Sequence, residues 1–310
     1  MSKQTKDPGF GRVYETQTKR FINKDGTLNT IKKGLQFTTS DFYLVMVNMS
    51  WGYFIFMIFI AFLIINSFFA GIYLMIGIED LSVPREGSFL DQFLYAFYFS
   101  SQTFTTVGYG AIAPKGHLAS IIASLEGMVG LCGFAFATGL LWGRFSRPNI
   151  RLVFSEQMIV APYKDLNAIM FRVANARKNV LMELEVSVTV SVEKQNDDKT
   201  FNRSYYRLDL EMSKINFMAS TWTLVHPINK DSPFFNWTKE DFDAHEGELL
   251  ILLKAYDETY SNHVHRRFSY LFNELVYGAK FIPAFHHSKD GDTVVDMDKI
   301  SDFENVPLNP

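Results

Sequence analysis

The chain has 310 residues, of which 47% are hydrophobic and 15% aromatic. Its formal net charge is −3, so no basic excess argues for a nucleic-acid partner. The single cysteine, Cys132, excludes an intrachain disulfide framework and fits a reducing compartment; it lies in an apolar run, where we expect it to pack as a small hydrophobe.

Residues 1–37 are predicted to form a cytoplasmic N-terminal arm. The first 36 residues carry eight Lys and Arg against three Asp and Glu, and they lack the apolar core of a signal peptide. The segment that follows, 38–48, places Phe42, Val45 and Met46 at helical spacing. We expect a short interfacial helix there, although it could also be the start of the first span.

Two long apolar runs predict two membrane spans. No charged residue occurs from Phe42 to Ile78, and the first span is predicted at Ser50–Gly77. The second is predicted at Leu118–Gly143, whose 26 residues would extend about 39 Å as a helix, enough to cross the hydrocarbon core. Between them, Phe89–Phe104 is too short to span and is typical of a re-entrant helix.

The loop after this short helix reads Thr-Thr-Val-Gly-Tyr-Gly over 105–110. Two glycines within three residues permit backbone conformations with positive φ. In a soluble protein this would be an ordinary glycine-rich turn. Between two spans it resembles the selectivity filter of potassium channels, in which carbonyl oxygens replace the hydration shell of the ion. The ligands would come from Thr106, Val107, Gly108 and Tyr109, with Gly110 closing the filter.

Basic residues set the expected orientation. The arm before the first span and the segment after the second are rich in Lys and Arg, and the intervening loop is not. Both termini are therefore predicted to be cytoplasmic, in the cell (inner) membrane.

The remainder of the chain predicts an all-β domain. Leu184, Val186, Val188, Val190 and Val192 alternate with polar residues, which is the period of a strand. Further strands are expected at 150–160, 168–175, 205–211, 221–226, 249–256 and 267–285. Thr238 followed by Asp241 predicts a capping box and one short helix. Many short strands favour a sandwich, and the acidic tail is expected to be mobile.

Together these features resemble the prokaryotic branch of the inward-rectifier potassium channel family. Beyond the loop, the resemblance rests on several short motifs in order, at 146–148, 152–155, 172–177, 226–233 and 269–274. It implies a homotetramer that conducts K⁺ passively through one central pore and is gated by anionic lipid. It also implies an α-helical pore domain joined to an immunoglobulin-like sandwich, with K⁺ as the permeant ion and no cofactor.

Phe134, Thr138 and Trp142 lie four residues apart and share one helix face. The resemblance places Phe134 in the pore cavity and Trp142 at the cytoplasmic constriction; alternatively, the face packs against the first span or lipid. Strong rectifiers carry an acid where this chain has Phe134, so we expect weak rectification, with polyamines or Mg²⁺ as possible blockers. Gly130 and Gly139 could act as hinges or allow close helix packing.

Glu126 is the only ionisable residue within the predicted second span, where a charge is costly. It could support the filter by hydrogen bonding, or make a structural contact with no effect on ions. In eukaryotic relatives an acid in the re-entrant helix pairs with a base after the filter. Gln102 and Ile112 stand at those positions here. We therefore expect the filter to be supported by contacts that differ from this ion pair, and we expect Gln102 to contribute to them.

Arg144, Arg147 and Arg151 follow the second span, where the resemblance implies lipid binding; a stop-transfer cluster is the simpler interpretation. Glu183 and Glu258 match family positions that face the cytoplasmic pore, and surface carboxylates are the alternative. His263 and His265 lack a third ligand nearby, so a metal site is not favoured, and proton sensing is a weaker hypothesis.

The sequence therefore predicts a potassium channel and not an enzyme, since no clustered nucleophile, base or metal set is present. Two alternatives remain: a two-span channel gated by a soluble ligand, and a membrane-anchored β-sandwich that conducts nothing. The expected divisions are the arm (1–37), the interfacial helix and pore domain (38–146), the β-sandwich (147–288) and an acidic tail (289–310).

Overall fold

The computed structural model describes residues 4–14, 20–34, 36, 38–84, 87–148, 150–195, 200–218 and 220–310. The chain divides into two compact units, which are described separately. We call Gly34–Arg147 the helical unit, and Met1–Lys33 together with Pro148–Pro310 the β unit.

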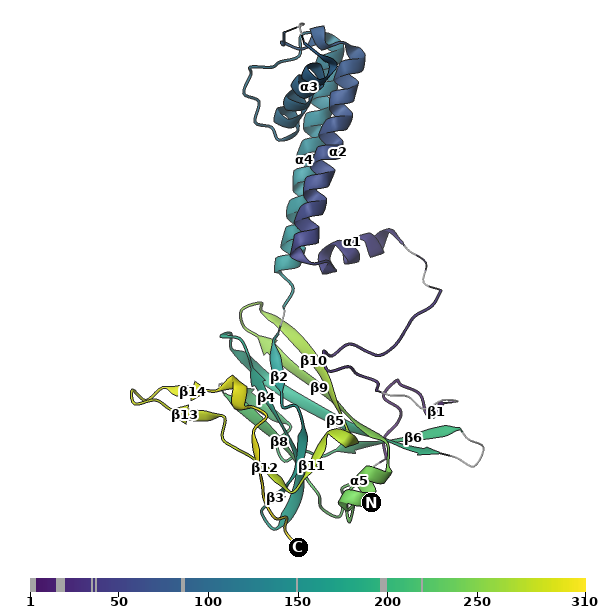
Figure 1. The fold of residues 1–310 in the computed structure, drawn as a ribbon, viewed down its shortest axis with the longest axis vertical. Helices are drawn as coiled ribbons and strands as arrows, with labels where there is room; N and C mark the ends of the chain where they lie inside the picture. Colours follow the sequence, from purple (N-terminus) through teal and green to yellow (C-terminus); the bar gives the residue numbers. More distant parts are fainter. Residues whose placement is uncertain are drawn as a thin grey trace. The chain divides into compact units, whose positions relative to one another are not determined.

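The helical unit contains two helices that are long and apolar enough to cross a membrane, α2 (Trp51–Ile76) and α4 (His117–Phe145). The short helix α3 (Phe89–Phe104) packs against both, as Figure 1 shows. The helix α1 (Thr39–Asn48) precedes α2, and a 3₁₀ turn, η1 (Ile78–Asp80), follows it. These ranges confirm the predicted two-span architecture with a short third helix.

Apolar contacts hold the helical unit together at two levels. Phe69 and Tyr73 of α2 are buried against Ala96 and Phe99 of α3. At the other end of the unit, Met46 of α1 belongs to a second buried cluster with α2 and α4. The face of α1 that packs is thus centred on Met46 and Val47, whereas Phe42 and Val45, which share the predicted face with Met46, are exposed.

The β unit is built from two main sheets. The strands are β1 (Val13–Tyr14), β2 (Leu152–Phe154), β3 (Met158–Tyr163), β4 (Leu166–Asn175), β5 (Leu181–Gln195), β6 (Phe201–Leu208), β7 (Lys214–Phe217), β8 (Thr221–Pro227), β9 (Gly247–Asp257), β10 (Asn262–Leu271), β11 (Leu275–Tyr277), β12 (Ala279–Phe281), β13 (Phe285–His287), β14 (Thr293–Val295) and β15 (Phe303–Asn305). One sheet has the order β1-β6-β5-β9-β10, with β7 also on β5; the other has the order β11-β3-β4-β2, with β8 also on β4. Short helical segments are α5 (Lys239–Ala244), η2 (Phe272–Glu274) and η3 (Met297–Lys299).

A common apolar core lies between the two sheets, as in a β-sandwich. Val186 and Ile251 from the first sheet share it with Met158 and Phe171 from the second. The predicted alternation in β5 is confirmed, since Leu184, Val186, Val188 and Val190 are all buried. The capping box is also confirmed: the Asp241 carboxylate accepts the Thr238 backbone N–H at 2.8 Å, and α5 begins there.

Two predicted strands prove to be several. The stretch 150–160 is divided into β2 and β3 by a turn at Ser155, whose hydroxyl bonds the Gln157 carbonyl at 2.8 Å. The stretch 267–285 is divided among β10, β11, β12 and β13, and Gly278, with a φ of 75°, makes one of the breaks. Apolar content extends across these turns, so it could not mark them.

The prediction of a mobile acidic tail is wrong. Strand β14 pairs with β13, and β15 pairs with β12. Ile300 is buried, and the Asn309 backbone N–H donates to the Asn167 side chain at 3.0 Å. The acidic residues of this segment are interspersed with apolar ones, of which Ile300 is buried and Phe303 is half-buried. The overall charge of the segment did not reveal these contacts.

The arm is tied to the first sheet. The buried Glu248 carboxylate accepts the backbone N–H groups of Phe21 and Ile22 at 2.7 and 3.1 Å. Arg20 forms an ion pair with Glu274. Residues 1–3, 15–19, 35 and 37 of the predicted arm lie outside the described residues.

His226 gives the β unit an expected dependence on pH. Its ring is buried, Nδ1 lies 2.7 Å from the Asp209 carbonyl and Nε2 lies 2.8 Å from the Ser232 hydroxyl. Burial lowers the pKa of His226 below the usual 6.5. The unfolded chain then binds the extra proton first, so stability is complete above pH 6.5 and falls as the pH drops below it.

We therefore expect the melting temperature of the full-length protein to decrease as the pH is lowered from about 7.5 to about 5.5, the range in which histidine becomes protonated. Circular dichroism of the β signal would measure it. The melting temperature of the His226→Gln protein should depend less steeply on pH than that of the wild type. The His286→Gln protein, which changes an exposed histidine, should keep the wild-type dependence. Equal slopes for all three proteins would contradict the assignment.

Candidate functional site

The helix α3 delivers the glycine-rich loop. Its start is fixed by Ser88 and Asp91, because the Asp91 carboxylate accepts the Ser88 backbone N–H at 2.9 Å and its hydroxyl at 2.7 Å. It ends where the Thr105 N–H donates to the Ser101 carbonyl. The partial negative charge of a helix C-terminus therefore lies at the start of the loop, where it favours a cation.

The loop backbone alternates in handedness. The angle φ is positive at Thr106 (59°), Gly108 (52°) and Gly110 (80°), and it is not positive at Val107 or Tyr109. Alternation of this kind directs successive N–H groups to one side of the chain. The Gln102 carbonyl accepts two of them, from Val107 at 2.9 Å and from Gly108 at 3.3 Å. The intervening carbonyl groups are consequently free to point the other way.

Gln102 thus contacts the loop through its main chain. Its side-chain Oε1 is buried and has no hydrogen-bond partner among the described residues. The side chains of Val107 and Tyr109 remain 51% and 79% exposed, so the helical unit does not itself cover the loop.

Glu126 and Gly130 lie behind α3 on one face of α4. Glu126 is fully buried, and its two carboxyl oxygens lie within hydrogen-bonding distance of the hydroxyl groups of Tyr73 and Ser100. At Gly130, a Cβ would lie 2.1 Å from the carbonyl oxygen of Phe104. The structure therefore shows Gly130 at a close helix contact, whereas Gly139 has no atom within 4 Å of a Cβ built on it.

The residues predicted to line a pore leave an open face on α4. Phe134 and Trp142 are 72% and 75% exposed, and Thr138 between them is also exposed. This face therefore does not pack against α2 of the same chain, and the pore and the lipid interpretations of the stripe both stay open.

Arg144 has a structural role that the sequence did not reveal. Its guanidinium donates to the carbonyl groups of Met46 (2.6 Å), Val47 (3.2 Å) and Met49 (2.7 Å) at the end of α1. It also lies 4.6 Å from the ring centroid of Trp51. A cation at a helix C-terminus satisfies its unpaired carbonyl groups and its dipole, so Arg144 fastens α1 to α4.

The two other arginines are more accessible. Arg147, which hydrogen-bonds the Asn48 side chain, is exposed at the end of the helical unit. Arg151 is exposed in the β unit.

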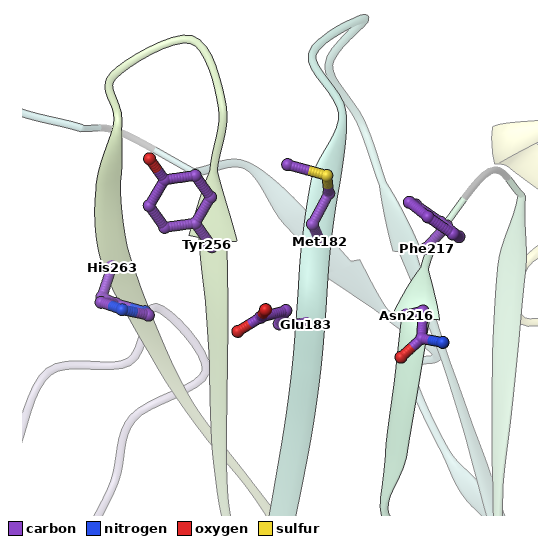
Figure 2. A pocket seen from close by; sticks show the side chains of 6 residues that line it. All are labelled: Met182, Glu183, Asn216, Phe217, Tyr256 and His263. Carbon is purple, nitrogen blue, oxygen red and sulfur yellow. The ribbon is translucent and has the colours of Figure 1, made fainter.

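Glu183 lies at a bulge in β5, where the register to β9 shifts, and it has a φ of 50°. It lines a cavity of about 480 Å³ with Met182, Asn216, Phe217, Tyr256 and His263, and Figure 2 shows these side chains. Glu258 is exposed in the turn between β9 and β10.

His263 stands opposite Tyr256 in the sheet and His265 opposite Lys254. Within the described part of the chain no three His, Cys, Asp or Glu residues form a group that could hold a metal ion.

The chain matches two families of known proteins. Residues 152–310 match the family described as "Inward rectifier potassium channel C-terminal domain", and residues 52–146 match the family "Ion channel". It is 32% identical to "Inward rectifier potassium channel Kirbac3.1" of Paramagnetospirillum magnetotacticum, over 92% of this chain and 95% of that protein.

Two animal proteins are also similar. The chain is 26% identical to "ATP-sensitive inward rectifier potassium channel 12" of Gallus gallus, over 97% of this chain and 76% of that one. It is 26% identical to "G protein-activated inward rectifier potassium channel 2" of Homo sapiens, over 91% and 73% of the two chains.

Proposed function

The chain belongs to the inward rectifier potassium channel family, and from that premise we propose that four copies surround one axis and that Thr106–Gly110 of each copy forms the filter. The protein is a membrane-embedded potassium channel and not an enzyme, and K⁺ is the ion that it conducts. The number of copies, the filter residues, the gate and the lipid response belong to the proposal.

The observation that carries the filter assignment is the alternating loop. The N–H groups of Val107 and Gly108 both face the Gln102 carbonyl, so their side of the loop is occupied by α3. Carbonyl groups on the opposite side, from Thr106 to Tyr109, would then replace the water around K⁺, and the Thr106 hydroxyl would add a further ligand. The exposed Val107 and Tyr109 side chains would be covered by neighbouring copies.

The open face of α4 would line the pore. Phe134 would lie in the cavity, and four copies of Trp142 would close the cytoplasmic end by excluding water from a narrow passage. Gly139 would allow α4 to bend, because no other part of the described chain lies within 4 Å of a Cβ built on it. With an apolar side chain at Phe134, internal polyamines or Mg²⁺ should block only weakly, so rectification should be weak.

The β unit would lie in the cytoplasm beneath the inner membrane, together with both termini, as the basic flanks of the spans indicate. Glu183 and Glu258 would face the cytoplasmic vestibule and concentrate K⁺ there. The divisions 1–37, 38–146, 147–288 and 289–310 are proposed as the functional segments.

Uptake of ⁸⁶Rb⁺ into liposomes that contain the purified protein tests the central proposal. An outward K⁺ gradient should drive uptake, external K⁺ should compete with the tracer, and Na⁺ at the same concentration should not. Native mass spectrometry should find four copies of the 35.6 kDa chain. Uptake that Na⁺ suppresses as well as K⁺ does would contradict a selective filter at Thr106–Gly110.

Arg147 should carry more of the lipid response than Arg144, because the guanidinium of Arg144 is engaged by α1 and Arg147 is exposed. One juxtamembrane basic residue contributes about 1 kcal/mol to the attraction to an anionic leaflet. Arg147→Gln should therefore change, by about fivefold, the anionic-lipid content at which the lipid effect on tracer uptake is half complete.

Tracer uptake across a series of anionic-lipid contents would measure this shift. The control is Lys289→Gln, which removes an exposed base from the tail. Identical lipid curves for Arg147→Gln and Lys289→Gln would remove Arg147 from the lipid site.

A further inference from the structure

Four polar side chains from three helices form one buried hydrogen-bonded line behind α3. Asn66 and Tyr73 come from α2, Ser100 from α3 and Glu126 from α4, and all four are buried. The Tyr73 hydroxyl lies 2.6 Å from Glu126 Oε2. Ser100 Oγ contacts Glu126 Oε1 and lies 3.0 Å from Asn66 Oδ1.

The orientation of the Asn66 amide is fixed at its other end. Its Nδ2 lies 2.7 Å from the Phe62 carbonyl oxygen, which can only accept a hydrogen bond. The amide oxygen must therefore be the atom that faces Ser100, and it needs a donor there. Among the described residues, the Ser100 hydroxyl is the only donor within hydrogen-bonding distance of Asn66 Oδ1.

Counting hydrogens then determines the remaining link. Ser100 has one hydroxyl hydrogen. If that hydrogen goes to Asn66, the hydrogen in the contact between Ser100 and Glu126 has to come from the carboxyl group. If Glu126 were ionised instead, one hydrogen would have to serve both acceptors, and one of them would lose its bond at a cost typical of an unsatisfied buried group.

The charge balance agrees with this count. No Lys, Arg or His forms an ion pair with Glu126 in the described part of the chain, and its two partners are neutral hydroxyl groups. An uncompensated carboxylate at this depth is expensive, and protonation removes the cost.

We infer that Glu126 is a neutral carboxylic acid that donates to Ser100. The bonds then run in one direction, from Tyr73 through Glu126, Ser100 and Asn66 to the Phe62 carbonyl, and each hydroxyl and carboxyl hydrogen has one acceptor. This line ties α3 to both spans at the level of Ser100, two residues before the Gln102 carbonyl that holds the loop.

The four side chains are therefore positioning residues for selective conduction, an inference that rests on the proposed filter. They contact no ion. They fix the height and rotation of α3, and through Gln102 they fix the backbone of Thr106–Gly110. The ion pair expected in eukaryotic relatives has no counterpart at Gln102 and Ile112, and a neutral relay performs its role from a different face of α3.

Infrared spectroscopy of the full-length protein in liposomes tests the protonation state without requiring conduction. The difference spectrum of wild type minus Glu126→Gln, recorded at neutral and mildly alkaline pH, should contain the carbonyl stretch of a protonated carboxylic acid. At these pH values exposed carboxyl groups are ionised and do not contribute. A spectrum with only the bands of an ionised carboxylate would overturn the inference.

Flux measurements test the positioning role. Glutamine mimics the neutral acid, since its amide can donate to Ser100 and accept from Tyr73, so Glu126→Gln should keep the Rb⁺ to Na⁺ flux ratio. Glu126→Ala leaves Ser100 and Tyr73 without this partner and should lower the ratio about tenfold. The control is Ser124→Ala, because Ser124 is exposed and its hydroxyl donates to the Ser120 carbonyl of its own helix.

A wild-type ratio in Glu126→Ala would refute positioning, and loss of selectivity in Glu126→Gln equal to that in Glu126→Ala would refute the neutral acid. Absence of Rb⁺ flux in both the wild type and a Trp142→Ala protein would refute the proposed function, and the infrared result would still decide the state of Glu126.

Discussion

The Gly130→Ala protein should lose selectivity for Rb⁺ over Na⁺. A methyl group at this position would lie 2.1 Å from the Phe104 carbonyl oxygen, 2.8 Å from its carbon and 3.0 Å from its Cα. These are backbone atoms at the end of α3, one residue before Thr105. They cannot move aside alone, as a flexible side chain could, so the loop must move with them.

The expected cost is that of overpacking, about 1–3 kcal/mol in each copy, which exceeds the gain of about 1 kcal/mol that alanine normally gives in a helix. The ratio of ⁸⁶Rb⁺ to ²²Na⁺ uptake in liposomes would measure the loss. Gly127→Ala is the matched control, because it lies on the same helix and has no atom within 4 Å of a Cβ built there.

This experiment also separates the two interpretations of Gly130 that the sequence left open. If Gly130 serves as a hinge, alanine should change total flux and leave the ratio of the two ions unaltered. If it serves close packing, as its contact with Phe104 indicates, the ratio should fall. An unchanged ratio together with altered total flux would contradict the packing interpretation.

The sequence predicted best what depends on local chemistry. The predicted span Ser50–Gly77 differs from α2 (Trp51–Ile76) only by its two capping residues, because an uninterrupted apolar run ends where polar or flexible residues begin. The limits of α3 agree fully with the predicted Phe89–Phe104, since a polar loop precedes the helix and the loop glycines follow its end. The family assignment is confirmed for the same reason, as it rested on short motifs in a fixed order.

What escaped prediction depends on partners distant in the sequence. An acid within the second span was evident at Glu126, but periodicity could not reveal that Ser100 and Tyr73 meet it from two other helices, or that Asn66 continues the line from Ser100. A basic residue after a span looks the same in the sequence whether it faces lipid or caps a helix. Only the fold shows that Arg144 caps α1.

The Gly108→Ala protein should fold and insert, yet take up no more ⁸⁶Rb⁺ than protein-free liposomes. A Cβ at Gly108 meets no atom within 4 Å among the described residues beyond its chain neighbours, so packing within one copy does not forbid alanine. The φ of 52° does oppose it, because a left-handed conformation costs a non-glycine residue about 1–2 kcal/mol.

Relief of that strain would rotate the peptide group between Val107 and Gly108. The Val107 carbonyl would then leave the side of the loop that we assign to K⁺, and the Gly108 N–H would leave the Gln102 carbonyl. In the proposed tetramer the penalty for keeping the native loop conformation is about 4–8 kcal/mol, so the rotated state should dominate and remove the proposed ring of four ligands.

Tracer uptake should be compared with that of Gly127→Ala, which adds the same methyl group to a right-handed helix in the same unit. Native mass spectrometry of both proteins would show that assembly is intact, so that lost uptake reports the filter and not the fold. Wild-type uptake by Gly108→Ala would mean that K⁺ is not coordinated at Thr106–Gly110. If wild type, Gly127→Ala and a Trp142→Ala protein with its constriction widened all failed to conduct, the non-conducting alternative would replace the proposed channel.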